Sequence, residues 1–214
     1  MAVPETWEEL KTEVATWMIR DDLTDQIPNF IGYAENRFNR EVLTQDRVET
    51  TTLTATTDSV ALPADFWGVR TIYVDGANKY PLEALTGQRL RELYHTSHSD
   101  IPKNYAIEGG FLLLGPAPSS STSIDLTYWE TIPALGDAQA TNWLLTAHPD
   151  LYLAASLMEA FTYTRDEQRA GLWDSRTAAK VEAINRAGRR YQYGGPLASR
   201  ARIGDVVYRA PRFP

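Results

Sequence analysis

The chain has 214 residues, of which 43% are hydrophobic and 23% are charged, so we expect a buried core and no global disorder. Its formal net charge of -7 argues against a general nucleic-acid binder, because such proteins gain affinity mainly by neutralising phosphates. It contains no cysteine, which excludes disulfides, zinc–thiolate sites and thiol nucleophiles and fits assembly in a reducing cytoplasm.

Two amphipathic helices are predicted at the start of the chain. Thr6 followed by Glu9 is a capping-box pattern, and Pro28 suits the first turn of a second helix. The first helix has its apolar residues at helical spacing, namely Leu10, Val14, Trp17 and Met18. The apolar stripe of the second is Ile27, Ile31, Ala34, Phe38 and Val42. Its opposite, polar face is predicted to be Glu35, Asn36, Arg37, Arg40 and Glu41.

Residues 45–141 have the patterns of strands and turns. Strands are predicted over residues 48–60, which are rich in threonine, and over 67–74 and 124–129. Thr86 can cap a short helix between them. Gly109 and Gly110 lie between two apolar runs, which predicts a hairpin because both turn positions need positive φ. These patterns do not distinguish a barrel from a sandwich.

Helices are predicted again after residue 142. Pro149 opens one of them, and the last runs from about Asp166 to Arg190 before the Gly194-Gly195-Pro196 stop. The predicted fold class is therefore α+β. Its expected segments are N-terminal helices (1–44), an inserted antiparallel β-rich domain (45–141), C-terminal helices that complete a helical bundle (142–190) and an extended C-terminal arm (191–214).

The predicted arm mixes basic and apolar residues. Its arginines include Arg200, Arg202, Arg209 and Arg212. Its apolar residues include Leu197, Ile203, Val206, Val207, Tyr208 and Phe213. A solvated tail is one interpretation, and a segment that becomes ordered on a partner is another. Direct DNA binding is a weaker interpretation, because the arm has no lysine and an acidic protein surface would suit the arginines equally well.

Patterns that carry catalysis are scarce. The sequence has no nucleophile elbow, P-loop, Rossmann glycine pattern or H-E-x-x-H helix. His95, His98 and Asp100 have a spacing that a metal site would use, but a solvated helix end is the favoured interpretation. We therefore expect no enzyme, no cofactor and no metal. A carbohydrate-active enzyme with two carboxylates stays a weak alternative. The six tryptophans are expected partly in the core and partly at subunit interfaces.

An ordered series of distinctive segments spans residues 6–190. The segments are 20–23 (RDDL), 34–40 (AENRFNR), 62–66 (LPADF), 80–83 (YPLE), 142–153 (NWLLTAHPDLYL) and 157–160 (LMEA). None of them is a catalytic motif. As a set of structural signatures, this series resembles the head-to-tail adaptor (connector) proteins of tailed bacteriophages.

The resemblance implies a structural virion protein at the head-tail junction, made in the host cytoplasm and without a membrane segment. It implies a homo-oligomeric, dodecameric ring under the portal protein, with tail nozzle or tail fibre proteins as further partners. Double-stranded DNA would pass through without sequence-specific binding. The arm is then the candidate portal-binding site, with Arg200, Arg202, Ile203, Val207, Tyr208, Arg209, Arg212 and Phe213. A tail nozzle or fibre-docking subunit is the alternative.

Overall fold

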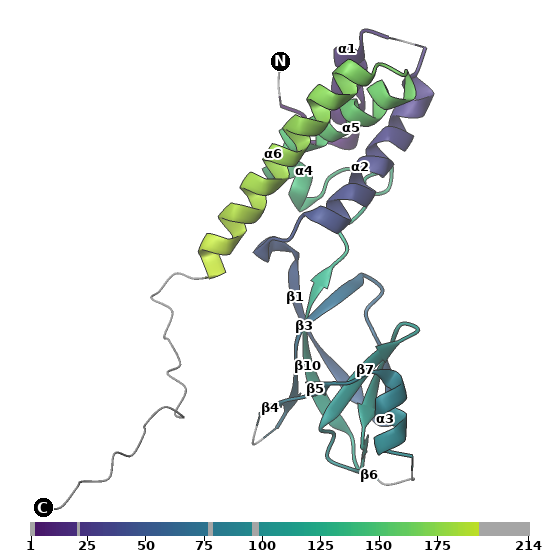
Figure 1. Cartoon of the computed structure of the whole chain (residues 1–214), viewed down its shortest axis with the longest axis vertical. Coiled ribbons are helices and arrows are strands. Elements are labelled where there is room, and N and C mark those ends of the chain that lie inside the picture. Colours follow the sequence, from purple (N-terminus) through teal and green to yellow (C-terminus); the bar gives the residue numbers. More distant parts are fainter. Residues whose placement is uncertain (1–2, 21, 77–78, 96–98, 193–214) are drawn as a thin grey trace, which may run out of the picture.

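The structure is a computed structural model that describes residues 3–20, 22–76, 79–95 and 99–192. The chain folds as a mixed α+β protein with mainly antiparallel sheets, which confirms the predicted fold class at that level. Figure 1 shows helices from both ends of the described chain lying together at the top, and the strands with one short helix lying below them. We call these groups the helical part and the β part.

The helices of the helical part begin and end largely where the sequence predicts. Its elements are α1 (Trp7–Met18), η1 (Thr24–Gln26), α2 (Ile27–Glu41), η2 (Gln45–Arg47), α4 (Trp143–Ala147), α5 (Pro149–Tyr163) and α6 (Glu167–Gln192). The capping box at Thr6 and Glu9 is present, and proline occupies the first turn of α2 and of α5. The short helix α4 was not predicted, although Asn142 caps it through its side chain.

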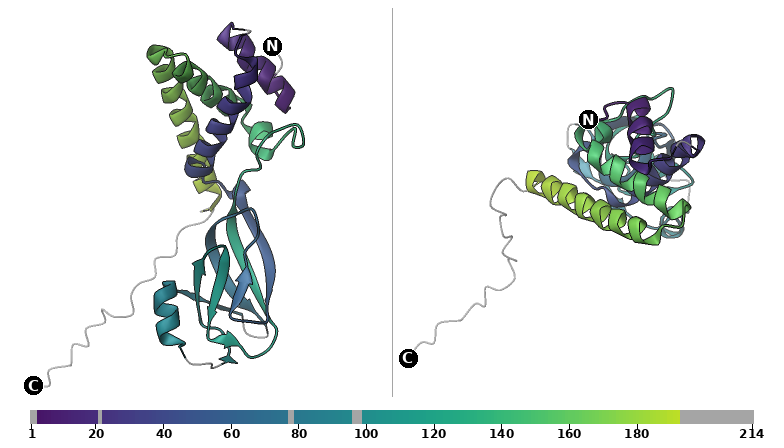
Figure 2. Two further views of the ribbon diagram at one scale, coloured as in Figure 1. Left: turned by 90° about the vertical axis from the view of Figure 1, so that its right-hand side faces the viewer. Right: turned by 90° about the horizontal axis from the view of Figure 1, so that it is seen from above.

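Helix α5 lies at the centre of the helical part. It packs against α1, α2, α4 and α6. A helix that is apolar on most of its faces needs neighbours all round, and α5 is of this kind. Its buried residues are Leu151, Tyr152, Ala154, Ala155, Ser156, Leu157, Ala160 and Phe161. Seen from above in Figure 2, α1 (dark purple) and α6 (yellow-green) lie on different sides of α5.

The β part contains ten strands and one helix within the described residues. They are β1 (Val48–Ala55), β2 (Ser59–Ala61), β3 (Phe66–Asp75), β4 (Tyr80–Pro81), β5 (Glu83–Ala84), α3 (Gly87–Leu93), β6 (Ser99–Asp100), β7 (Asn104–Glu108), β8 (Phe111–Gly115), β9 (Ala117–Pro118) and β10 (Thr122–Glu130). One four-stranded sheet has the order β1-β10-β3-β4 and the other β2-β8-β7-β5, while β6 and β9 form a separate pair.

The two four-stranded sheets share one hydrophobic core, so the β part is a sandwich rather than a barrel. The residues of this core are Ala55, Ile72, Val74, Leu82, Leu112, Leu114, Ile124, Leu126 and Tyr128. Strand β10 alternates between buried and less buried residues, as predicted. The predicted hairpin joins β7 to β8, with φ of 59° at Gly109 and 83° at Gly110.

Four details differ from the sequence predictions. Glu35 was expected on the polar face of α2, yet it is buried because its carboxylate meets donors from other segments. Trp17 was expected on an apolar face but is 44% exposed. The pairs β5–β7 and β6–β9 are parallel, although each is only two residues long. Ile132 and Leu135, which follow β10, pack in the core of the helical part.

Candidate functional site

The predicted portal-binding arm lies outside the described residues. This holds for Arg200, Arg202, Ile203, Val207, Tyr208, Arg209, Arg212 and Phe213. The structure does describe the helix that precedes the arm. Near the end of α6, Asn185 Oδ1 accepts the N–H of Leu43 at 2.8 Å, and Asn185 Nδ2 donates to the carbonyl of Glu41 at 2.7 Å. The last turns of α6 therefore lie beside η2, where the helical part meets the β part.

Arg47 is the largest fully buried side chain in the described chain, and it lies at this junction. Its Nε and Nη2 donate to the carbonyl of Glu130 at 2.9 and 2.7 Å. Its Nη1 donates to the carbonyls of Val42 at 2.6 Å and Asn39 at 3.1 Å. One guanidinium therefore joins the C-terminus of α2 to the end of β10. We call these contacts the Arg47 joint.

The surroundings of Arg47 suit a buried cation in spite of the cost of removing it from water. The carbonyls at the C-terminal end of α2 carry the negative end of the helix dipole. The ring of Trp67 lies 5.1 Å from the guanidinium carbon, within cation–π range. Burial still lowers the pKa of Arg47. No local sequence pattern signals this role, because the bonded carbonyl of Glu130 is 83 residues away from Arg47.

A second buried polar network joins α2 to α5 and to the segment after β10. Glu35 Oε1 accepts the N–H of Leu135 at 2.8 Å and the hydroxyl of Tyr152 at 3.2 Å. Asn142 Nδ2 donates to the hydroxyl oxygen of Tyr152 and to the carbonyl of Pro133, both at 2.7 Å. Burial raises the pKa of Glu35, although the two donated hydrogen bonds oppose this shift. This network fixes how the returning chain enters the helical part.

An open hollow of about 630 Å³ lies between the two parts. It is lined by Gly32, Glu35, Asn36, Asn39, Ala64, Asp65, Thr131, Ile132, Pro133 and Ala134. On the β side, the hydroxyl of Tyr128 donates to the carboxylate of Asp65 at 3.1 Å. Burial and the nearby Asp65 raise the pKa of Tyr128 to about 12. The carboxylates of Glu35 and Asp65 beside the hollow thus already accept hydrogen bonds within the chain.

The C-terminal end of α1 and the turn between α5 and α6 lie at the end of the helical part farthest from the β part (Figure 1). Four large apolar side chains in and near these segments are exposed. They are Trp17, Ile19, Tyr163 and Leu172, which we call the end surface. The ring of Trp17 packs edge-on against Trp173 at 5.6 Å between centroids, so α1 and α6 touch here. Trp17 and Trp67 are the two exposed tryptophans among the described large apolar residues, and their place at subunit interfaces stays a prediction.

The backbone at this end is also unusual. Ile19 and Arg165 are the two non-glycine residues with positive φ in the described chain, at 55° and 59°. A left-handed conformation costs an L-residue roughly 1–2 kcal/mol, and a β-branched side chain rarely adopts it. The side chain of Ile19 is 89% exposed, so burial in this chain does not offset that cost. An apolar side chain held out in this way suits contact with another protein surface.

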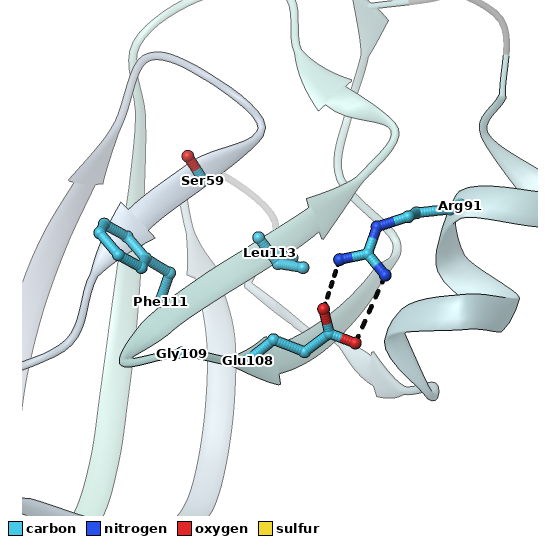
Figure 3. A pocket seen from close by; sticks show the side chains of 6 residues that line it. All are labelled: Ser59, Arg91, Glu108, Gly109, Phe111 and Leu113. Atoms are coloured by element: carbon cyan, nitrogen blue, oxygen red, sulfur yellow. Dashed lines mark hydrogen bonds and ion pairs between the residues drawn. The ribbon is translucent and has the colours of Figure 1, made fainter.

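The β part has its own shallow pocket, shown in Figure 3. It measures about 460 Å³ and is lined by Ser59, Arg91, Glu108, Gly109, Phe111 and Leu113. Arg91 of α3 forms an ion pair with Glu108 of β7, and the two charges neutralise each other at the rim (Figure 3). The ring of Phe111 is exposed. Exposed aromatic side chains such as Phe111 are enriched at protein–protein interfaces.

The histidine pattern does not form a metal site in the described chain. His95 is exposed and its Nδ1 lies 3.0 Å from the carbonyl of Glu92, while His98 lies outside the described residues. Across the described ranges, no group of three or more histidine, aspartate or glutamate side chains is arranged to hold a metal ion. No helix in the same ranges is both long and apolar enough to cross a membrane.

Comparison with known proteins gives one family. A family model described as SU10 adaptor protein matches residues 5–200. The match covers the helical part and the β part, and it ends within the C-terminal segment before Arg202 and most of the other predicted arm residues. A search of curated proteins finds no match.

Proposed function

The chain belongs to the SU10 adaptor protein family, a family of phage head-to-tail adaptors, and on that premise we propose that it forms a dodecameric ring beneath the portal. Membership makes it a structural component of the virion and implies a role without catalysis. The ring would join the capsid to the tail. The observation that supports this role best is the family match together with a two-part fold joined by a buried arginine.

The proposed division of the chain follows from its two cores. Residues 1–44 and 142–190 form the portal-side helical domain, and residues 45–141 form an inserted β domain that faces the tail. The chain has one hydrophobic core among the helices and another between the sheets, which supports two units. The helical core also takes in Ile132 and Leu135 from the end of residues 45–141. Exposed Phe111 and Ile107 on the β part would then contact nozzle or fibre proteins.

The C-terminal segment from residue 191 is proposed to bind the portal protein. The helix before it, α6, reaches Gln192 and passes the C-terminal end of α2 through the hydrogen bonds of Asn185 with Leu43 and Glu41. Its arginines would pair with acidic groups, and its apolar residues would fill pockets or add a strand on the portal. Because a ring presents many copies of the segment at once, weak single contacts would add up to a firm joint.

DNA would pass through the ring without specific binding. The net charge of -7 supports this view, because a mainly acidic wall attracts phosphates weakly and lets the duplex slide. Binding to duplex DNA should therefore be weak at physiological salt. Tight DNA binding that falls steeply as salt rises would contradict this part of the proposal.

Native mass spectrometry of the chain mixed with its portal ring tests the proposed function. We expect copies to join the portal ring in matching number. Deleting residues 194–214 should weaken the complex strongly, and replacing Arg200, Arg202, Arg209 and Arg212 with glutamine should weaken it less, because the apolar residues stay.

A matched control is Lys103→Gln, which removes one exposed charge from the β part. It should leave portal binding unchanged. A full-length chain that does not bind the portal but binds tail proteins would favour the nozzle or fibre-docking role. Equal portal binding with and without residues 194–214 would reject the arm as the portal site.

A further inference from the structure

Helix α6 packs through one face only. Thr177, Val181, Ile184 and Gly188 are buried on that face, and the backbone of Gly188 lies close to Thr44. The opposite face is exposed along most of the helix. Its members include Leu172, Ser175, Ala179, Glu182, Ala183 and Arg186. We call this the outward face of α6, and it has no partner within the described chain.

The charge on α6 is opposite to the charge on the whole chain. The helix has six arginine or lysine residues and three acids, in a chain whose net charge is -7. Five of its charged residues form ion pairs. Asp174 pairs with Arg37, Lys180 with Asp150, and Arg169 with Asp166, while Arg186 pairs with Glu182 inside the helix. Arg176 and Arg189 have no carboxylate within ion-pair distance in the described ranges. A basic, partly apolar face therefore stays available.

The acidic complement of that face lies on α1. Residues 3–16 contain four glutamates, Glu5, Glu8, Glu9 and Glu13, and one lysine. A hollow of about 330 Å³ runs along this face, lined by Val3, Pro4, Glu8, Glu9, Thr12 and Glu13. Val3 is exposed and gives the hollow an apolar end. We call this the outward face of α1.

The two outward faces cannot meet within one copy of the chain. Both helices turn their buried residues towards α5, so both exposed faces point away from it, on different sides (Figure 2). We propose that the outward face of α6 in one copy packs against the outward face of α1 in the next. Two different surfaces then meet head to tail, the type of contact that closes into a ring. This inference rests on the proposed ring and assigns its subunit contact.

The contact follows from charge and shape together. Arg176 and Arg189 flank the short side chains of Ala179 and Ala183, which allow a close approach between helices. Leu172 and Val3 are exposed apolar side chains, one on each surface. The charges of the two faces are opposite, so wrong pairings of like faces, α6 with α6 or α1 with α1, are repelled.

Because the chain has no cysteine, single thiols can report this contact without background. Thr12→Cys and Ala179→Cys are made as separate variants, mixed in equal amounts with portal rings, and treated with a short bismaleimide. We expect cross-linked heterodimers at least ten times more abundant than in either variant alone. A chain with both cysteines should give a ladder of higher oligomers. The control pair, Thr12→Cys with Lys103→Cys, should give neither product.

Charge reversal provides a second readout. Arg176→Glu with Arg189→Glu should lower the heterodimer yield several-fold, and adding Glu5→Lys with Glu8→Lys to the partner variant should restore it. Portal-bound rings without heterotypic cross-links, or yields insensitive to both reversals, would overturn this contact and leave the proposed function standing. Cross-links that form while portal binding fails would support the contact and reject the proposed function.

Discussion

Polar side chains lie inside the helical part, whereas in the β part they stay mostly at the surface. Glu35, Arg47 and Asn142 are buried at the helices and at their junction with the sheets. The β core consists of apolar residues and Tyr128, while its ion pairs, such as Arg91 with Glu108, are exposed. Apolar burial alone tolerates several packings, but a buried donor or acceptor accepts only its own partner. Fewer packing arrangements are therefore compatible with the helical part than with the sandwich.

The largest effect should come from Arg47→Met. This change roughly keeps the volume of the side chain but leaves the backbone carbonyls of Asn39, Val42 and Glu130 without their hydrogen-bond donor. We expect a loss of about 3–5 kcal/mol, because each buried carbonyl left without a donor costs about 1–3 kcal/mol. Urea unfolding followed by circular dichroism measures it. Arg70→Met, an exposed neighbour on β3, should cost less than about 1 kcal/mol. Similar losses for both variants would contradict a special role of the joint.

A core truncation in each part should have the next largest effect. Leu126→Ala in the β core and Leu157→Ala in the helical core each remove a fully buried side chain. We expect roughly 2–4 kcal/mol for each. Hydrogen exchange read by mass spectrometry should show faster opening of the β part alone for Leu126→Ala. Uniform opening of both parts would mean that they unfold as one unit.

Asn142→Ala removes a helix cap and two buried hydrogen bonds at once. It leaves the N–H of Leu145 and the carbonyl of Pro133 without their side-chain partner. We expect a loss of about 2 kcal/mol in thermal or urea unfolding. Asn142→Asp keeps the cap oxygen but cannot donate, so its loss should be similar or larger beside Glu35. A fully stable Asn142→Asp would show that the donated bonds matter little.

A smaller and pH-dependent effect is expected for Glu35→Gln. Burial raises the folded-state pKa of Glu35, so its protonated form is favoured in the fold. Its contribution to stability is therefore complete below the ordinary glutamate pKa and is lost as pH rises through the raised value. Glutamine cannot ionise but still accepts both hydrogen bonds. The variant should gain up to about 1 kcal/mol relative to the native chain at neutral pH.

The measurement for Glu35→Gln is the difference in unfolding free energy between variant and native chain from pH 4 to pH 8. Taking the difference removes the contribution of other carboxylates. Asp22 and Asp125, whose pKa values are lowered by Arg20 and Lys79, act in the opposite direction in both proteins. A difference that stays flat with pH would show that Glu35 is not strained by burial.

The smallest effect should come from Arg91→Gln in the β part. Both members of its ion pair with Glu108 are exposed to solvent, so water and salt screen the interaction. We expect a change within about 0.5 kcal/mol in urea unfolding. A loss as large as that of Asn142→Ala would mean that exposed polar groups of the β part stabilise the fold as much as buried polar groups of the helical part do.

Local signals in the sequence were sufficient for most elements. Thr6 with Glu9, Pro28, Pro149 and the Gly109–Gly110 pair each act within a few residues, and the structure has the expected cap, helix starts and hairpin there. The stripe of α2 is buried throughout, because helical spacing alone fixes which residues share a face. Glu35 lies beside that stripe and was assigned to the wrong side.

The buried polar contacts that the sequence did not predict join residues far apart in the chain. Glu35 meets Tyr152 across 117 residues, and Arg47 meets Glu130 across 83. No local pattern encodes such pairs, so buried polar residues look like surface residues until the fold is known. The predicted arm residues lie outside the described ranges, and their portal-binding role stays a prediction.

The chemistry of the Arg47 joint has a consequence for acid resistance. Surface ion pairs fail in acid because their carboxylates take up protons. The acceptors at Arg47 are mainly backbone carbonyls, which do not titrate, and the guanidinium stays positively charged there. The angle between the helices and the sandwich should therefore persist at an acidic pH at which the surrounding ion pairs are lost.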